Sequence, residues 1–123
     1  MTSSAEGDRF AVDVRPAGEG VVVLALAGEL DHDTAEPLRA ALTAAIGSGV
    51  HRLLVDFTEL RFCDSTGLNV LLHSRLDVQA AGGSIALVGL RQPVARMFRI
   101  TGADAIFPVY PEVAQALAEP RHA

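Results

Sequence analysis

The 123-residue sequence contains no lysine and no tryptophan, and it has a single cysteine. One cysteine excludes an internal disulfide and a zinc site built from several cysteine ligands. Without lysine there is no P-loop, because that phosphate-binding motif requires one. Aromatic residues make up only 5% of the chain, so the core must be mainly aliphatic. No apolar run reaches the ~18 residues of a membrane-spanning helix, and we expect no membrane association.

The charge balance points away from nucleic acid as a partner. The formal net charge is −5, whereas nucleic-acid-binding domains usually carry a basic surface. With 50% hydrophobic and 20% charged residues, the composition is that of one globular domain. Residues 1–9 lack the apolar stretch of a signal peptide, so we expect a cytoplasmic protein.

Strand and helix patterns alternate along the chain. The alternating residues 10–14 and the apolar run 21–27 predict a hairpin joined by a turn, followed by a polar loop at 28–33. Three more buried strands are predicted, at 53–57, 84–88 and 105–109. Helices are expected to begin near Asp33, after residues 64–67, at Pro93 and at Pro111. The order ββαβαβαβα predicts a single α/β domain over residues 10–118, with a mixed, mostly parallel sheet, about four helices and flexible tails at 1–9 and 119–123.

Local patterns define the expected helix starts and buried faces. Asp33 and Glu36 have the spacing of a capping box at the start of the first helix. Apolar stripes predict which side chains of the later helices face the core. These inward-facing residues are Leu68, Leu71, Leu72 and Leu76 in the second helix, and Val94, Met97, Phe98 and Thr101 in the third.

The most informative segment is residues 62–68, FCDSTGL, where a strand turns into a helix. One interpretation is that Asp64 and Ser65 only cap the helix. The other is that Ser65 is exposed and can be phosphorylated, with the phosphoryl group lying over the free N–H groups of the helix start. Phosphorylation would add a charge of about −1.5 to −2 beside Asp64. Such a group can block a partner without unfolding the domain.

Other polar residues suggest weaker candidates. Asp31, His32 and Asp33 are either metal ligands or part of a loop that caps a helix. The loop is favoured, because three adjacent residues rarely converge on one ion. Cys63 is either a small buried apolar residue or a redox centre. An enzyme using Ser65 as nucleophile would need a base, but His73 is about two helical turns away. We therefore expect no catalysis, no metal and no cofactor.

Three stretches of the sequence carry a family resemblance when taken together. The first is 26–31 (LAGELD) with Thr34 and Ala35, the second is 55–57 (VDF) through 62–68, and the third runs from 82–83 (GG) through 93–98 (PVARMF) to 101–102 (TG). In this order and spacing the chain, over residues 11–117, resembles the STAS-domain family. Within that family it is similar to the bacterial anti-sigma factor antagonists.

The resemblance implies a phosphorylation switch that regulates transcription indirectly. Ser65 corresponds to the serine that is phosphorylated by the anti-sigma factor, itself a serine/threonine kinase. The unphosphorylated antagonist binds this kinase and so releases the sigma factor, and a serine phosphatase restores binding. Asp31 corresponds to the family's loop aspartate, so the expected partner-binding residues are Asp31, Asp64, Ser65, Thr66 and Gly67, with Thr66 as a possible second acceptor. The alternative is a STAS scaffold or regulatory subunit of another signalling or transport assembly.

Overall fold

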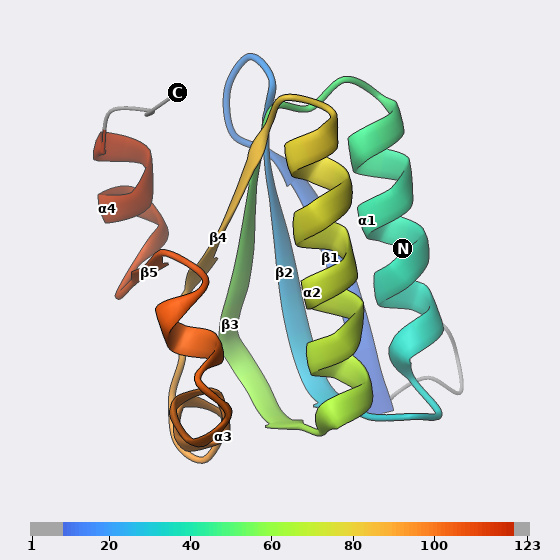
Figure 1. Ribbon diagram of the computed structural model, residues 1–123, viewed down its shortest axis with the longest axis vertical. Coiled ribbons are helices and arrows are strands. Elements are labelled where there is room, and N and C mark those ends of the chain that lie inside the picture. The colour runs from blue at the N-terminus through green and yellow to red at the C-terminus, as the bar shows by residue number, and fades with distance from the viewer. Residues whose placement is uncertain (1–8, 120–123) are drawn as a thin grey trace.

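A five-stranded sheet lies at the centre of the computed structural model, which describes residues 9–119 (Figure 1). The strands are β1 (Phe10–Pro16), β2 (Val21–Leu30), β3 (Arg52–Cys63), β4 (Ser84–Val88) and β5 (Val109–Tyr110). The helices are α1 (Ala35–Gly47), α2 (Ser65–Ala80), α3 (Val94–Thr101) and α4 (Val113–Ala118), with a 3₁₀ turn, η2, at Ala103–Ala105. Apart from η2, this is the predicted order ββαβαβαβα.

The sheet is mixed and mostly parallel, as predicted. The strands lie in chain order, and β1 pairs antiparallel with β2 while the three later pairings are parallel. Because each parallel crossover moves one strand in the same direction, right-handed connections bring α1, α2 and α3 to one face. Figure 1 shows α1 and α2 side by side across that face.

The two faces of the sheet carry separate apolar clusters. Successive residues of a strand point to opposite faces, so Leu53 joins the large cluster under the helices while Leu54 joins a smaller one. Helix α4 covers the smaller cluster with Val113 and Ala116. The large cluster is mainly aliphatic, and within it Phe57 and Phe98 meet edge to face at 5.6 Å between ring centroids.

Strand β2 is longer than expected, because residues 28–30 belong to the strand and not to a polar loop. Gly28 pairs with Phe10 on one side and with Leu60 on the other. Its φ of +95° is a conformation that favours glycine, and a Cβ there would lie 2.0 Å from the Arg9 carbonyl oxygen. Glycine thus lets β1 approach β2 closely up to the end of the sheet.

The predicted capping box at the start of α1 is wrong. Thr34, not Asp33, occupies the N-cap position, and its side chain makes no capping hydrogen bond. The Asp33 N–H instead donates to the Asp31 carboxylate at 2.9 Å. Aspartate at a strand end competes for nearby backbone N–H groups, and this turn forms before the helix begins.

Two of the expected inward-facing side chains are exposed. Leu76 is 57% exposed, and Thr101 is also exposed at the end of α3. Both lie at the margins of their apolar stripes. Thr101 turns its hydroxyl back to the Met97 carbonyl at 2.9 Å, a local bond that satisfies it at the surface.

The strand expected at 105–109 is wrong except at its last residue, because β5 consists of Val109 and Tyr110 only. Gly102 ends α3 in a left-handed conformation, and η2 follows, with Ala103 buried. Phe107 is only 3% exposed and anchors the segment to the core before β5 begins at Val109. Helix α4 then begins at Val113, not at Pro111.

The predicted tails fall mostly on residues 1–8 and 120–123, which lie outside the described residues. Within residues 9–119, no helix has the length and apolarity needed to cross a membrane. In the same range, no three His, Cys, Asp or Glu side chains come together as a metal site would require.

Candidate functional site

The sheet brings Asp31 and Asp64 to the same end, where the parallel strands β2 and β3 terminate. Asp31 follows the end of β2, and Asp64 follows the end of β3. The last residues of these strands, Leu30 and Cys63, are partners in the parallel register. The Asp64 N–H also donates to the Leu30 carbonyl at 3.1 Å, which ties the two strand ends together. Two predicted site residues, 33 positions apart in the numbering, are therefore anchored to one another through the backbone.

Asp64 is the N-cap of α2, as its position in the sequence suggests. Its Oδ1 accepts hydrogen bonds from the N–H groups of Thr66, at 2.9 Å, and Gly67, at 3.2 Å. A carboxylate at this position also meets the partial positive charge of the helix start. Ser65 is the first residue of the helix, and its side chain is exposed. The cap thus fixes the backbone on which the Ser65 hydroxyl is presented.

The same cap corrects one expectation about Ser65. A phosphoryl group was expected to lie over free N–H groups, but the amides of Thr66 and Gly67 already donate to Asp64. The Leu68 N–H is also engaged, by the Asp64 carbonyl at 3.1 Å. A phosphoryl group on Ser65 would therefore find these three amides already bonded, and its charge would add to that of Asp64.

Asp31 organises the loop between β2 and α1. Its Oδ1 accepts hydrogen bonds from the N–H groups of Asp33 and Thr34, and its Oδ2 pairs with the Arg9 guanidinium. Partial burial acts to raise the pKa of Asp31, but the Asp33 N–H, Thr34 and Arg9 outweigh it and lower that pKa below its ordinary value of 3.8. Asp31 is therefore held as a carboxylate with its charge partly compensated.

The sequence reasoning missed the charged neighbours of Asp31. Arg9 lies 3.7 Å from Glu29, and Arg61 lies 4.0 Å from the same carboxylate. These residues come from β2, β3 and the segment before β1, so only the strand register brings them together. The pairing of Phe10 with Gly28 is the signal that would have placed Arg9 beside Glu29.

Gly67 and Cys63 form the buried floor of the site. A Cβ on Gly67 would lie 2.7 Å from Leu30 side-chain atoms and 3.0 Å from the Cys63 Sγ. Only glycine allows the first turn of α2 to lie this close to the sheet. Burial, together with the charge of Asp64, raises the pKa of the Cys63 thiol to about 12. Cys63 is 5% exposed and is the small buried apolar residue that its strand position predicts.

Two further side chains shape the surface beside Ser65. Thr66 is half-buried, so it is less accessible than Ser65. Phe62 is 45% exposed near the end of β3, although its neighbour Cys63 is buried. Exposed aromatic residues are common in protein–protein contacts. Phe62 was in the motif quoted from the sequence, but its exposure follows from the irregular register between β2 and β3.

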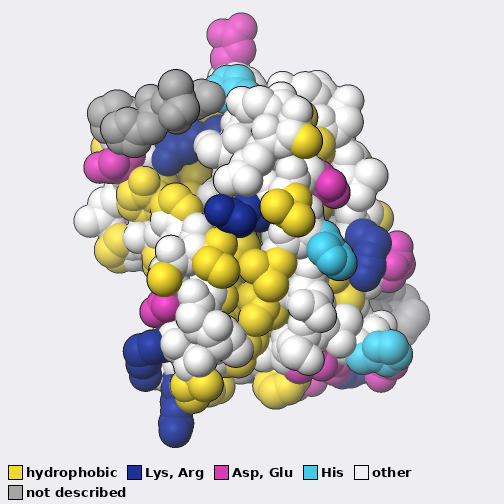
Figure 2. All heavy atoms as spheres, in the orientation of Figure 1, with side chains coloured by type: hydrophobic (Ala, Val, Ile, Leu, Met, Phe, Trp, Pro, Cys, Tyr) yellow, Lys and Arg dark blue, Asp and Glu magenta, His cyan; other side chains and the backbone are white. Residues whose placement is uncertain are grey.

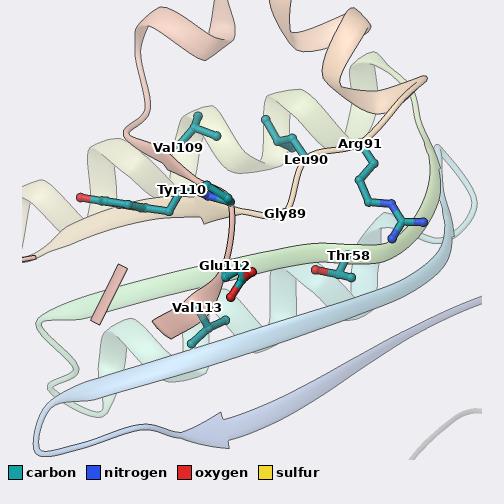
Figure 3. A pocket seen from close by; sticks show the side chains of 9 residues that line it. Thr58, Gly89, Leu90, Arg91, Val109, Tyr110, Glu112 and Val113 are labelled. Atoms are coloured by element: carbon teal, nitrogen blue, oxygen red, sulfur yellow. The ribbon is translucent and has the colours of Figure 1, made fainter. Parts of the chain in front are cut away.

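Ser65 lines neither of two pockets in the described residues. One pocket, of about 570 Å³, lies beside β5 and the start of α4, where Arg91, Tyr110 and Glu112 surround Gly89 (Figure 3). The other, of about 360 Å³, lies between α1 and α2 and includes Arg39 and His73. The site is thus an open surface, which suits a macromolecular partner better than an enclosed small ligand.

Hydrophobic side chains also reach the surface on the helix-covered face. Figure 2 shows hydrophobic side chains in the middle of that face, beside a basic side chain, with other charged side chains toward the border. The largest exposed fractions in α2 and α3 belong to Leu76 and Ile100, at 57% and 70%. Single exposed apolar residues are ordinary, so this distribution does not by itself define a second site.

The fold and the site together define a single STAS-type α/β domain with a serine at the start of its second helix. The chain belongs to the STAS domain family. The family model described as "Mlab, STAS domain" matches residues 14–109, which include the whole of β2, β3 and β4, the end of β1 from Val14 and the first residue of β5.

Relatives and solved structures bear the names of antagonists. The chain is 33% identical over 101 residues to the "Anti-sigma F factor antagonist" of Paenibacillus polymyxa, covering 81% of this chain and 86% of that protein. It matches the unphosphorylated anti-sigma factor antagonist SpoIIAA with a TM-score of 0.77 and 27% identity, over 87% of this chain and 93% of the other. The phosphorylated form of the Bacillus cell fate determinant SpoIIAA matches with a TM-score of 0.71 and 26% identity, over 87% and 96%. The resemblance and the fold class are thereby confirmed.

Proposed function

We propose that this protein is an anti-sigma factor antagonist whose binding is switched off by phosphorylation at Ser65. In its unphosphorylated form it binds an anti-sigma factor serine/threonine kinase, which then releases its sigma factor. The observation that carries the proposal is the exposed Ser65 hydroxyl on the capped first turn of α2, next to Asp64. Support also comes from the relatives named as antagonists and from a structural match titled as a phosphorylated form.

The phosphoryl transfer needs only an accessible hydroxyl on this chain. The Ser65 oxygen attacks the γ-phosphorus of ATP and forms a bond to it, the bond between the γ-phosphorus and the departing ADP oxygen breaks, and a base of the kinase takes the hydroxyl proton. The kinase supplies the positioning and the electrostatic stabilisation. We assign no catalytic role to this protein, and a serine phosphatase would return Ser65 to its free form by hydrolysis. We infer that the switch operates in the cytoplasm.

The partner-binding surface that we propose is the one surrounding Ser65. Asp31 and Asp64 supply acidic groups at its two strand ends, and Thr66 contributes a half-buried hydroxyl. Gly67 supports this surface indirectly, because the absence of a side chain lets the first turn of α2 pack against Leu30. A partner that recognises two carboxylates would present basic groups to this surface.

The energetic requirement of the switch matches what one phosphoryl group can do. Converting a nearly fully bound population to a nearly fully free one takes about 5.5 kcal/mol. An unpaired charge buried in an interface costs about 2–5 kcal/mol or more, and the bulk of the group adds to this. Since Asp64 occupies the nearest helix amides, the phosphoryl charge has little local compensation. Ser65 must then lie near the centre of the contact, because exposed charge at the rim is screened.

The test is affinity capture from a lysate of the source organism, followed by mass spectrometry. The baits are the parent, Ser65→Ala and Ser65→Glu, and Thr43→Glu is the control because it puts the same charge on an exposed position of α1. We expect a serine kinase with the parent, Ser65→Ala and Thr43→Glu baits, and at least about tenfold less with Ser65→Glu. Equal capture by all four baits, or no kinase on any of them, contradicts the proposal.

A further inference from the structure

Strand β1 forms an open edge of the sheet. Within residues 9–119 the strand order begins with β1 and ends with β5, so among the described strands each of these has a neighbour on one side only. β5 has two residues, whereas β1 has seven and pairs with β2 along its whole length. Its other side offers unpaired backbone groups over a length that can accept another strand.

The backbone groups that face this open edge can be assigned from the register. The Ala17 N–H donates to the Val21 carbonyl at 2.9 Å, next to the pairing of Pro16 with Val22. In an antiparallel pair every second residue bonds to the neighbour, so the groups of Val12 and Val14 point outward. The Pro16 carbonyl also points outward, but proline has no N–H to donate.

The side chains of β1 divide by face in a matching way. Val14 lies on the same face as Val12, which packs against the main core, yet Val14 is 54% exposed. Asp13 and Arg15 lie on the opposite face, next to one another, with exposed fractions of 64% and 59% and a separation of 2.7 Å. The open edge thus presents an exposed valine with one acidic and one basic residue beside it. Such a surface is self-complementary, because the acidic residue of one copy can face the basic residue of another.

We propose that β1 pairs antiparallel with β1 of a second copy of this chain, around a twofold axis at Val14. Each Val14 then exchanges both backbone hydrogen bonds with Val14 of the other copy. Each Val12 N–H reaches the Pro16 carbonyl of the other copy, which tolerates the missing proline N–H. The two Val14 side chains meet on one face, and the sheets join into one.

Charge complementarity selects this register over its neighbours. With the axis at Val14, Asp13 lies directly opposite Arg15 of the other copy, and this pair occurs twice. Moving the axis to Asp13 places Asp13 opposite its own copy, and moving it to Arg15 places Arg15 opposite its own copy. An axis at Val12 opposes Arg15 with Arg9. Like charges directly opposite one another are destabilising, so of these four axes only the one at Val14 is free of such a contact.

The helix above β1 leaves room for the second copy. Arg39 and Thr43 line the pocket between α1 and α2, so they mark the side of α1 that faces α2. The side that faces the β1 edge is the opposite one, about half a helical turn around from these two residues. That side carries the small, uncharged residues Ala41 and Ala44. No charged side chain of this helix would be trapped as two copies of α1 approach one another.

The dimer would leave the Ser65 site accessible. Ser65 and Asp31 lie at the end of the sheet where Phe10 begins β1, whereas the contact is centred at Val14. Because the two β1 strands run in opposite directions, the two sites lie at opposite ends of the joined sheet. Pairing through β1 is therefore independent of the proposed function.

Sedimentation equilibrium of the full-length chain tests the pairing. The variants are Asp13→Arg, Arg15→Asp and the double reversal Asp13→Arg/Arg15→Asp, with Asp104→Arg, an exposed position in η2, as the control. We expect a dimer for the parent, the control and the double reversal. Each single variant opposes like charges twice and should dimerise at least about tenfold more weakly.

Mixing the two single variants separates this contact from the ion pair within each chain. A chain with two arginines facing a chain with two aspartates restores both cross-strand pairs, so the mixture should form a heterodimer. Circular dichroism confirms that each variant is folded. A parent that stays monomeric up to millimolar concentration, a single variant that dimerises as tightly as the parent, or a mixture that stays monomeric would overturn the proposal.

Discussion

Two acidic turns lie side by side at one edge of the sheet, and they use their carboxylates differently. In the loop after β2, Asp31 accepts the N–H groups of its own turn and also pairs with Arg9, a cation 22 positions away. In the turn after β3, Asp64 binds the amides that begin α2, and no ion pair to Asp64 is found in the described part of the chain. The exposed Ser65 follows directly.

The Asp31 loop is therefore held by its own contacts, whereas the Asp64 turn carries the residue that can be modified, Ser65. The Asp31 loop has its charge compensated and its hydrogen bonds satisfied before any partner arrives. The Asp64 turn is equally well ordered but presents an open hydroxyl whose modification would add uncompensated charge. A phosphoryl group at Ser65 can therefore change the surface strongly while the backbone beneath it stays in place.

The largest expected effect on stability comes from the floor of the Asp64 turn. Gly67→Ala puts a methyl group 2.7 Å from Leu30 side-chain atoms and should lower the free energy of unfolding by about 1–3 kcal/mol, as overpacking does. Gly47→Ala is the control, because nothing lies within 4 Å of its Cβ position in α1. Urea unfolding should show loss only for Gly67→Ala, and equal stability of the two variants would contradict the close approach.

A smaller effect is expected from the cap itself. Asp64→Ala removes the acceptor of the Thr66 and Gly67 amides and should cost about 1 kcal/mol, a typical value for a lost N-cap. Asp33→Ala is the matched control, since Asp33 is not the N-cap of α1. Its stability should stay within about 0.5 kcal/mol of the parent in thermal unfolding. A larger loss for Asp33→Ala than for Asp64→Ala would reinstate the capping box.

The smallest effect is a pH dependence arising from the Asp31 loop. The pKa of Asp31 is lower in the folded protein than its ordinary value of 3.8, so the folded state binds the Asp31 proton less readily than the unfolded state. The stabilisation is complete above pH 3.8 and is lost as the pH falls through the lower folded pKa. Asp31→Asn should show a shallower loss of stability below pH 3.8 in acid titrations followed by circular dichroism. An unchanged slope would remove Asp31 as the source.

Much of the fold could be predicted because its signals are local. The strand at residues 84–88 was predicted with the bounds that the structure shows, since a short apolar run between glycines and a loop leaves little choice. Residues 28–30 were predicted as loop because the polar residues 31–33 follow them directly, whereas pairing with β3, and at Gly28 also with β1, makes them a strand. The two-residue β5 could not be placed from pattern alone, because burial of Phe107 decides where the chain turns.

The site was only partly predictable, because some of its contacts are local in the sequence and others depend on how distant segments pair. The position of Ser65 at a helix start follows from the short motif around it, and the structure shows that residue exposed. The engagement of the nearby amides by Asp64, and the ion pair between Arg9 and Asp31, depend on three-dimensional geometry. Arg9 joins the site only through the alignment of β1 with β2, which no local pattern contains.

The most direct test of the account is to locate the phosphoryl group. The parent and Ser65→Ala are incubated with ATP and the kinase captured by the unphosphorylated protein, and each is analysed by intact-mass and fragment mass spectrometry. The account predicts a single phosphoryl group on Ser65 of the parent and none on Ser65→Ala. A phosphoryl group on Thr66 or elsewhere, or equal labelling of both proteins, would contradict the assignment of Ser65 as the switch.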